Sequence, residues 1–324
     1  MSATEFEIIA RYFAKNYPQR KDVILGVGDD GAICHIPQGM QLVTSVDTLV
    51  EGVHFTNKAS PEDIGYKALA VNLSDLAAMG ATPAWMTLAL TCPNIDEVWL
   101  ARFSLGLNHL ATQMEVSLIG GDVTRGHLTI TIQVMGFVPE NTALRRDHAQ
   151  IGDNIYVTGT LGDAGLGLAV TQNEVVLLPE VQDFVESRLH RPTPRVEEGQ
   201  LLRTIANSSI DISDGLLADL GHILTLSQVG ANLQLDDFPL SHSLKEQLPL
   251  EIAWNLALSS GDDYELCFTV PPERETQLKN VLSPESYTRI GTIETEMGIR
   301  CFHHHDRLFR PKAQGYEHFA AQLD

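Results

Sequence analysis

The sequence predicts an α/β (α+β) protein of two units, each with a mixed sheet flanked by helices. Three observations support this fold class. Runs with the alternation of strands and runs with the periodicity of helices occur in both halves of the chain. The 324 residues amount to about two average domains. A polar, charged stretch over residues 139–150 offers little to a core. We therefore place a metal- and ATP-binding, dimerising unit in residues 1–139 and a C-terminal α/β unit in residues 140–324.

The strands of the first unit are predicted from short apolar runs. The runs cover residues 23–27, 32–36, 41–46, 85–92, 116–119 and 128–138. Small residues and aspartates follow most of these runs, as expected where strands end in turns. The run at 41–46 leads to Asp47, and the run at 116–119 leads to Asp122. A second helix is expected over residues 95–114.

The first long helix carries signals at both of its ends. Ser60 is the expected N-cap, Pro61 occupies the first helical position and Asp63 completes a capping box. Gly80 ends the pattern. Asp75 projects from the mostly apolar, inward face of this helix. A carboxylate on such a face needs a partner.

The second unit begins with a strand at 155–158 and a glycine-studded turn at 159–167. The connector 191–194, a helix, a turn at 210–215 and a helix to about residue 229 follow, with closing strands around Leu233, Leu266 and Ile290. The glycine turn could open a helix N-terminus towards an anion. A tight strand-to-helix turn without a ligand explains it at least as well.

Composition argues against several classes of protein. The formal charge of −20 would repel a nucleic-acid backbone. Four widely separated cysteines form no Cys-x-x-Cys pair, which argues against a disulfide framework or a zinc cluster and fits a reducing cytoplasm. Neither a secretory signal nor a run of about 18 apolar residues occurs. We therefore expect a soluble, cytoplasmic protein with no nucleic-acid or membrane partner.

Six short motifs carry aspartates flanked by small residues, on strand ends or a helix face. They are Gly28-Asp29-Asp30, Ser45-Val46-Asp47, Asn72-Leu73-Ser74-Asp75, Gly120-Gly121-Asp122, Asp211-Ile212-Ser213-Asp214 and Gly261-Asp262-Asp263. Each alone is ordinary turn or cap chemistry. Six in one chain indicate a functional cluster, whose like charges need compensation if they converge. None of the motifs contains Lys or Arg.

Oxygen ligands with little His or Cys among them point to Mg²⁺ or Ca²⁺. The motifs lack the spacing of a calcium-binding loop, whereas ligands scattered over two units suit Mg²⁺ held together with substrate phosphates. The implied substrate is a phosphate compound such as a nucleotide. The chain has no Gly-x-x-x-x-Gly-Lys-Ser/Thr loop and no protein-kinase signature, so neither common ATP-binding route applies.

Longer strings around these aspartates resemble a known family. The strings are GVGDD at 26–30, SVDTLVEGVHF at 45–55, NLSDLAAMGA at 72–81, GGD at 120–122, DISDGL at 211–216, GDDYEL at 261–266 and GYEHF at 315–319. They are similar to those of thiamine-monophosphate kinases, in the superfamily of aminoimidazole-ribonucleotide synthetase and selenophosphate synthetase. The resemblance implies that superfamily's two-domain fold, a homodimer with its active site between the two domains, and Mg²⁺- and ATP-dependent phosphorylation of thiamine monophosphate to thiamine diphosphate.

The resemblance also implies roles for individual residues. Metal contacts fall on Asp30, Ser45, the backbone of Val46, Asp47, Asp75, Asp122, Asp211 and Asp214. ATP contacts fall on Gly121, Asp122, Arg146 and Ser213, and catalysis is expected to rest on Asp75, Asp122 and Arg146. Substrate contacts fall on His54, Asp262 and an aromatic residue, either Tyr316 or Phe319. Asp262 stands where the family usually has Glu, so we expect that contact to be longer or mediated by water.

Three other functions stay open at this point. The first is another ATP-dependent phosphotransferase of the same superfamily. Selenophosphate synthetase loses weight because its reactive Cys or selenocysteine is expected in a flexible N-terminal segment, whereas the first cysteine here is Cys34, in a predicted strand. The second is a Mg²⁺-dependent phosphohydrolase that activates water with the same aspartates. The third is a non-catalytic binding protein whose aspartates hold a structural cation.

Overall fold

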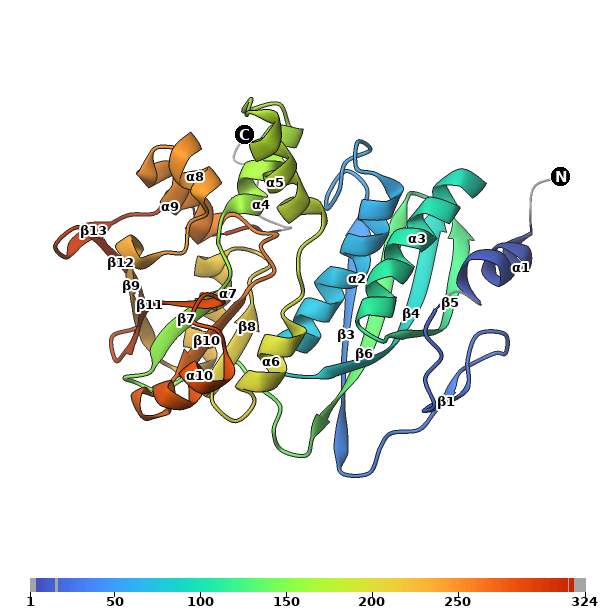
Figure 1. Ribbon diagram of the computed structural model, residues 1–324, viewed down its shortest axis with the longest axis horizontal. Helices are drawn as coiled ribbons and strands as arrows, with labels where there is room; N and C mark the ends of the chain where they lie inside the picture. Colours follow the sequence, from blue (N-terminus) through green and yellow to red (C-terminus); the bar gives the residue numbers. More distant parts are fainter. Residues whose placement is uncertain (1–3, 15–16, 314, 318–324) are drawn as a thin grey trace. The chain divides into compact units, whose positions relative to one another are not determined.

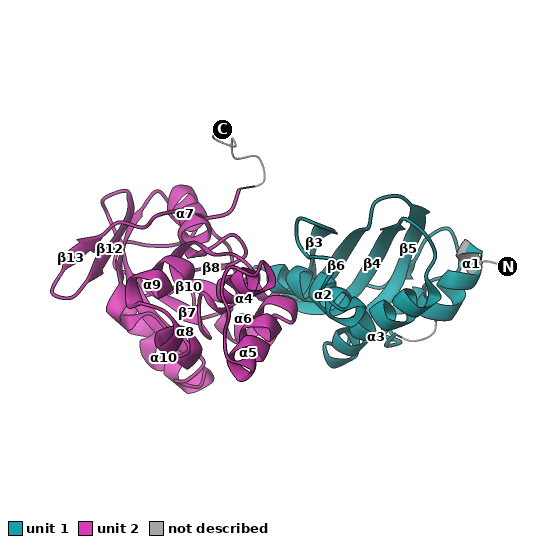
Figure 2. Cartoon of the chain, turned by 90° about the horizontal axis from the view of Figure 1, so that it is seen from above, with its two compact units in different colours: residues 1–76, 81–143 teal, residues 77–80, 144–324 magenta. Residues whose placement is uncertain are grey.

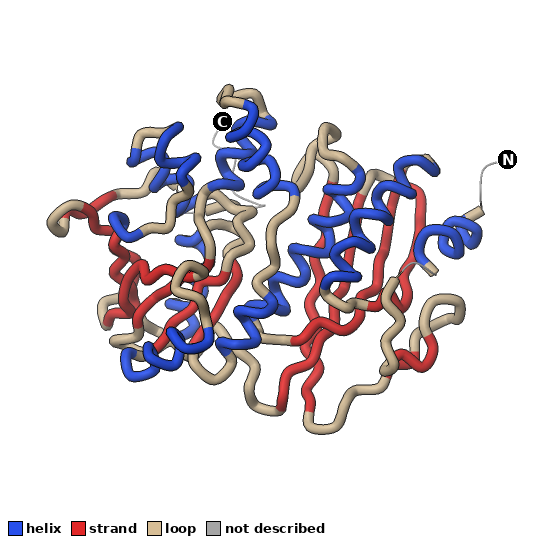
Figure 3. Tube along the Cα trace, viewed as in Figure 1, coloured by secondary structure: helices blue, strands red, loops and turns tan. Residues whose placement is uncertain are grey.

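The structure is a computed structural model that describes residues 4–14, 17–313 and 315–317. The chain forms two compact units (Figure 2). Unit 1 comprises residues 1–76 and 81–143, and unit 2 comprises residues 77–80 and 144–324. We expected the division between residues 139 and 140. In the structure, the first unit extends to residue 143, and residues 77–80 belong to unit 2. Both units combine sheets with helices (Figure 3), so the predicted fold class is confirmed.

Unit 1 is built on a four-stranded sheet. In spatial order its strands are β3 (Met40–Val50), β6 (Thr129–Pro139), β4 (Thr82–Cys92) and β5 (Ser117–Arg125). β4 and β5 run parallel, and the other neighbours run antiparallel. The helices α2 (Pro61–Ala78) and α3 (Glu97–Gln113) lie along one face of this sheet (Figures 1 and 2). Ser60 caps α2 as predicted, since its hydroxyl accepts the N–H of Asp63 at 3.1 Å and donates to the Asp63 carboxylate at 2.7 Å.

The opposite face of the sheet is partly covered by the hairpin of β1 (Val23–Leu25) and β2 (Ile33–Cys34). Val23 and Cys34 pack there against Trp85 and Phe137. The N-terminal helices α1 (Glu5–Ile8) and η1 (Ile9–Phe13) lie beside α3, where the Ser104 hydroxyl donates to the carbonyl of Tyr12 at 2.7 Å.

Two strands of unit 1 continue past the aspartates that were expected to end them. β3 continues past Asp47 to Val50, and β5 continues past Asp122 to Arg125. The expectation that these aspartates end their strands was therefore wrong. The cause is pairing with neighbours distant in sequence, since Asp47 lies opposite Ile132 of β6 and Asp122 lies opposite Ala89 of β4. Both carboxylates consequently project from regular sheet positions.

Unit 2 is built on a seven-stranded sheet. In spatial order its strands are β13 (Arg307–Phe309), β12 (Gly298–His303), β9 (Gly230–Gln234), β11 (Tyr287–Glu294), β7 (Asn154–Thr158), β10 (Leu266–Val270) and β8 (Ser208–Asp211). Its helical segments are α4 (Asp163–Thr171), α5 (Pro179–His190), α6 (Val196–Leu202), α7 (Leu216–Ser227), η2 (Leu235–Asp237), α8 (His242–Gln247), α9 (Leu250–Ser259), η3 (Pro272–Arg274) and α10 (Glu275–Val281). Trp254 and its apolar neighbours form the core.

At the glycine turn before α4, a side chain of the protein itself binds the N–H at the start of the helix. Gly162 is the N-cap, with φ of 87°, and its N–H donates to the Asp263 carboxylate at 2.8 Å. Asp263 is 1% exposed. Because a buried carboxylate of the chain already receives this N–H, the structure favours a tight strand-to-helix turn over an anion site.

Candidate active site

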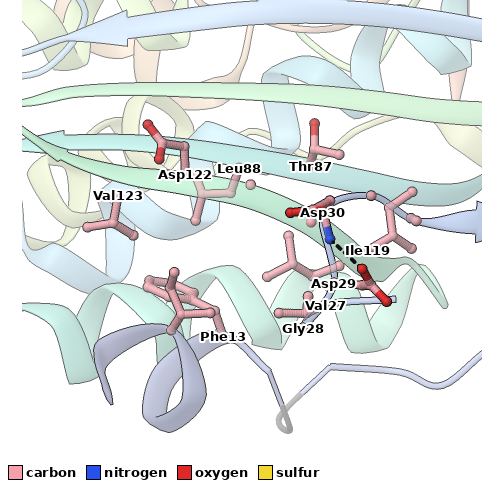
Figure 4. A pocket seen from close by; sticks show the side chains of 16 residues that line it. Phe13, Val27, Gly28, Asp29, Asp30, Thr87, Leu88, Ile119, Asp122 and Val123 are labelled. Atoms are coloured by element: carbon pink, nitrogen blue, oxygen red, sulfur yellow. Dashed lines mark hydrogen bonds between the residues drawn. The ribbon is translucent and has the colours of Figure 1, made fainter. Parts of the chain in front are cut away.

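A pocket in unit 1 brings together two of the predicted metal ligands. It encloses about 590 Å³ and is lined by the turn 28–31, by residues 120–123 of β5, by Thr87 and Leu88 of β4, and by Ile9 and Phe13 among its neighbours (Figure 4). Asp30 and Asp122 both line it, as does Gly121. Asp29 also lines the pocket, and its side chain accepts the N–H of Asp30 at 2.8 Å.

A second group of predicted ligands lies between β3 and α2. The Ser45 hydroxyl donates to the Asp75 carboxylate at 2.5 Å, which is the partner that the inward-facing Asp75 requires. The N–H of Asp47 donates to the side-chain oxygen of Asn72 at 3.0 Å, and the Asn72 amide donates to the carbonyl of Ala68. Ser45 and Asp47 therefore both point to α2, as alternation along a strand requires.

Val46, between these two residues, has its side chain on the other face of the sheet and is 56% exposed. Only its backbone lies beside Ser45 and Asp47, in agreement with a contact made through the main chain.

His54 follows β3 in a tight turn. Its Nδ1 accepts the N–H of Val50 at 3.0 Å. A ring nitrogen that accepts a hydrogen bond carries no proton, so the exchangeable proton of the neutral ring is on Nε2. The side chain of Lys67, which is 2% exposed, donates to the carbonyl of His54 at 3.5 Å. These contacts hold the His54 ring in place with its proton on Nε2.

Unit 2 joins three of the predicted motifs through backbone hydrogen bonds. Asp211 ends β8, and residues 212–215 connect it to α7. The carbonyl of Ser213 accepts the N–H of Asp262 at 2.9 Å, and the carbonyl of Asp214 accepts the N–H of Tyr316 at 2.9 Å. Residues predicted to bind metal, nucleotide and acceptor therefore meet at one turn.

The contact between the first two of these motifs requires glycine. A Cβ on Gly261 would lie 2.3 Å from the carbonyl oxygen of Ser213. Asp262 then adopts φ of 68°, a left-handed conformation that Asp tolerates better than most residues. Tyr316 is 51% exposed, and Phe319 lies outside the described residues.

Asp219 in the first turn of α7 anchors this turn. One of its carboxylate oxygens accepts the N–H groups of Ser213 and Asp214, each at 3.0 Å. Burial raises the pKa of Asp219 to about 7, and the charge of Asp214 adds to this. The two N–H groups and the positive charge of Arg146 lower that pKa.

The predicted metal ligands thus fall in three places: the pocket of unit 1, the space between β3 and α2, and the turn before α7. Within residues 4–14, 17–313 and 315–317, no three His, Cys, Asp or Glu side chains form a group that could hold a metal ion. The donor set itself consists of carboxylate, hydroxyl and backbone oxygens, which suits Mg²⁺. The assignment of these residues to metal stays a prediction.

Sequence reasoning gave no role to Asn72 or Asp219. Asn72 lies within a string that carried the family resemblance, but only its contact to Asp47 reveals what it does. Asp219 lies five residues after Asp214, where an acidic residue in a first helical turn is unremarkable. Both residues act on the backbone of a predicted ligand.

The two-unit architecture and these motifs define a class of protein. The model of the AIR synthase related protein N-terminal domain matches residues 28–138, and the model of the corresponding C-terminal domain matches residues 150–304. The hydrogenase maturation protein HypE of Escherichia coli, 18% identical with a TM-score of 0.75, shares this fold.

More similar relatives narrow the class. The chain is 48% identical over 323 residues to thiamine-monophosphate kinase of Escherichia coli K12, covering 99% of each chain. The crystal structure of thiamine-monophosphate kinase from Stenotrophomonas maltophilia K279a is 46% identical, with a TM-score of 0.83 over 87% of this chain and 92% of that one. The solved structure of AaThiL complexed with AMPPCP and TMP is 31% identical in sequence. Its TM-score is 0.77, over 90% of this chain and 92% of that one. The chain belongs to the thiamine-monophosphate kinase family, as the sequence strings indicated.

Proposed function

We propose that this protein transfers the γ-phosphoryl group of ATP to thiamine monophosphate, giving thiamine diphosphate and ADP, and that the reaction requires Mg²⁺. The observation that carries the proposal is the 48% identity to the Escherichia coli enzyme over 99% of both chains. The relative AaThiL, crystallised with AMPPCP and TMP, supports a nucleotide and a second ligand in this fold. A hydrolase or a binding module has no specific observation in its favour.

The acceptor determines what catalysis requires. A phosphate monoester with a second pKa of about 6 is mostly dianionic at neutral pH, so its oxygen can attack without a general base. The chain then has to hold the two phosphates in line and offset their charge, and no phosphoenzyme is needed.

The described residues divide this work between them. Mg²⁺, when bound, would neutralise charge on the transferring group. Its proposed ligands in unit 1 are Asp30 and Asp122 of the pocket and the metal-binding residues of β3 and α2. Those proposed in unit 2 are Asp211 and Asp214. Ser213 and Gly121 would contact the nucleotide. Arg146 would offer its planar guanidinium to phosphate oxygens.

The acceptor side falls to residues of different chemistry. His54 would donate its Nε2 proton to the acceptor, since Nδ1 is already engaged. Asp262 would contact the acceptor from a backbone held against Ser213, and Tyr316 or Phe319 would stack on a ring of the substrate.

One assay tests the function. The full chain is incubated with Mg·ATP and thiamine monophosphate, and the products are separated by chromatography. Formation of equal amounts of thiamine diphosphate and ADP is the expected result. Phosphate release without an acceptor would replace the proposal with a hydrolase. ADP formed only with another acceptor would indicate a related phosphotransferase, and no turnover would indicate a binding protein.

We further propose that the protein is a cytoplasmic homodimer. The dimer is supported by exposed apolar side chains of β3, namely Met40, Leu42 and Val46, on the face that α2 does not cover. Cys34, Cys92, Cys267 and Cys301 form no disulfide, which is in keeping with a reducing compartment. No helix among the described residues is long and apolar enough to cross a membrane.

A further inference from the structure

We propose that Asp219 is a positioning residue, which fixes the turn of Ser213 and Asp214 in the shape that Mg·ATP requires. The inference rests on the proposed function, because that function assigns Ser213 to the nucleotide and Asp214 to the metal. Asp219 itself is only 3% exposed and lies behind the turn, so it acts through the backbone of these two residues.

The hydrogen bonds of Asp219 are specific to the turn. The same oxygen, Oδ2, accepts the N–H of Ser213 and the N–H of Asp214, both at 3.0 Å. These N–H groups precede α7, which begins at Leu216 after Gly215 with φ of 110°. N–H groups near a helix start lack intrahelical acceptors, so without Asp219 they would have to find water or a different backbone conformation.

The turn also supports the other two motifs of unit 2. The turn constrains Asp262 and Tyr316 as well, because the carbonyl of Ser213 accepts the N–H of Asp262 and the carbonyl of Asp214 accepts the N–H of Tyr316. On the opposite side, Gly261 approaches Ser213 so closely that a Cβ would not fit. A displacement of the turn would therefore displace residues assigned to both substrates.

Two substitutions separate hydrogen bonding from charge. Asp219→Asn keeps one carbonyl oxygen, which can accept both N–H groups as Oδ2 does, and removes the charge. Asp219→Leu keeps a similar size and removes the acceptor. Asp153→Leu is the matched control, since Asp153 is 2% exposed and accepts the N–H of Gln150 in unit 2, in a site unrelated to the predicted ligands.

Titration calorimetry measures the affinity for Mg·AMPPCP, and steady-state kinetics measures the KM for Mg·ATP. Differential scanning calorimetry measures the Tm. We expect Asp219→Asn to stay within about threefold of wild type, and Asp219→Leu to lose about tenfold or more in affinity. Asp153→Leu should lower the Tm without changing that affinity. Wild-type affinity in Asp219→Leu would overturn the proposal. An equal loss in Asp219→Asn would also overturn it, because charge rather than positioning would then be responsible.

Amide hydrogen exchange is a second measurement, which does not require Asp219→Leu to fold. The amides of Ser213 and Asp214 should exchange slowly in the absence of ligand, and should remain slow in Asp219→Asn. If these two amides of the wild type exchanged as fast as those of an unstructured peptide, the proposal would be overturned. If the wild type binds Mg·AMPPCP but makes no thiamine diphosphate, the proposed function fails while these measurements still decide the role of Asp219.

Discussion

At the scale of single residues, hydrogen bonds fix two of the residues assigned to metal. The Ser45 hydroxyl donates to the Asp75 carboxylate, and the Asn72 side-chain oxygen accepts the backbone N–H of Asp47. The first contact orients a side chain and the second fixes the main chain. Removal of residues that hold metal should affect the chemical step more than acceptor binding.

The first prediction compares a metal ligand with an acceptor contact. Asp122→Asn should lower kcat by orders of magnitude, because it removes a charge that holds Mg²⁺ in the transition state. His54→Ala should act chiefly on the KM for thiamine monophosphate, since the residue supplies one donor to the bound acceptor. Steady-state kinetics at saturating ATP distinguishes the two. Loss of kcat in His54→Ala together with an active Asp122→Asn would refute the assignment.

A second prediction concerns the buried carboxylate of Asp263. Burial raises its pKa well above the ordinary value, and its Oδ1 has no hydrogen-bond partner in the described part of the chain. Because the folded state binds this proton more tightly than the unfolded state, the stabilising contribution is complete below a pH of about 4 and is lost as the pH rises towards the folded pKa.

Asp263→Asn cannot ionise and should lack this loss. Urea unfolding at pH 5 and at pH 8 measures it. Between pH 5 and pH 8, the free energy of unfolding of the variant should rise relative to that of wild type. The rise should be about 1.4 kcal/mol for each unit of this interval that lies below the folded pKa of Asp263. Parallel pH profiles for the two proteins would show that Asp263 does not titrate in this way.

At the scale of elements, the parallel pair β4 and β5 places the Gly120-Gly121-Asp122 motif in the pocket. A Cβ on Gly121 would lie 1.9 Å from the carbonyl oxygen of Leu88, whereas at Gly120 the nearest heavy atom is the Thr87 methyl carbon at 4.0 Å. The second glycine is therefore required by the closeness of the two strands, whatever it contributes to nucleotide binding.

Gly121→Ala should cost at least about 2 kcal/mol of stability, because the strands must separate to admit the methyl group. Gly120→Ala, one residue earlier in the same strand, should change stability by less than about 1 kcal/mol. Chemical unfolding of both variants provides the comparison. Equal stabilities of the two variants would mean that the backbone of β4 at Leu88 can move aside without a loss of stability.

At the scale of the whole molecule, charge dominates the expected behaviour. The chain carries a formal charge of −20, and the residues assigned to ATP and metal are mostly aspartates. A triphosphate cannot approach such carboxylates without cations between them. ATP binding measured by calorimetry should therefore be strong with Mg²⁺ and much weaker in EDTA. Equal affinity under both conditions would contradict a Mg²⁺-bridged site.

The proposed homodimer is tested through the face of the unit 1 sheet that α2 does not cover. Light scattering at micromolar protein should give twice the chain mass. Leu42→Lys should shift the mass towards the monomer, because a charge replaces an apolar side chain, 42% exposed, on that face. Leu168→Lys, at a residue 39% exposed on α4 of unit 2, is the matched control and should remain dimeric. A monomeric wild type would refute the dimer.

The sequence by itself determined the local features. The N-cap bond from Asp63 to Ser60 lies within four residues, so hydrogen-bonding propensity is enough to predict it. The fold class and the aspartate motifs were likewise predicted, because periodicity and turn chemistry are local properties of the chain. The helices α8, α9 and α10 and the strands β12 and β13 of unit 2 were not predicted. The partner for Asp75 was expected, but its identity as Ser45, 30 residues away, was not.

Only the tertiary structure decided what depends on pairing between distant segments. It extended β3 and β5 beyond Asp47 and Asp122, since β6 and β4 supply cross-strand hydrogen bonds that an isolated stretch lacks. It gave the N–H of Gly162 to Asp263, 101 residues along the chain. It also joined Ser213 to Asp262 and Asp214 to Tyr316 through backbone atoms. Every residue except proline has both a backbone N–H and a carbonyl, so no side-chain pattern reveals which of them will meet.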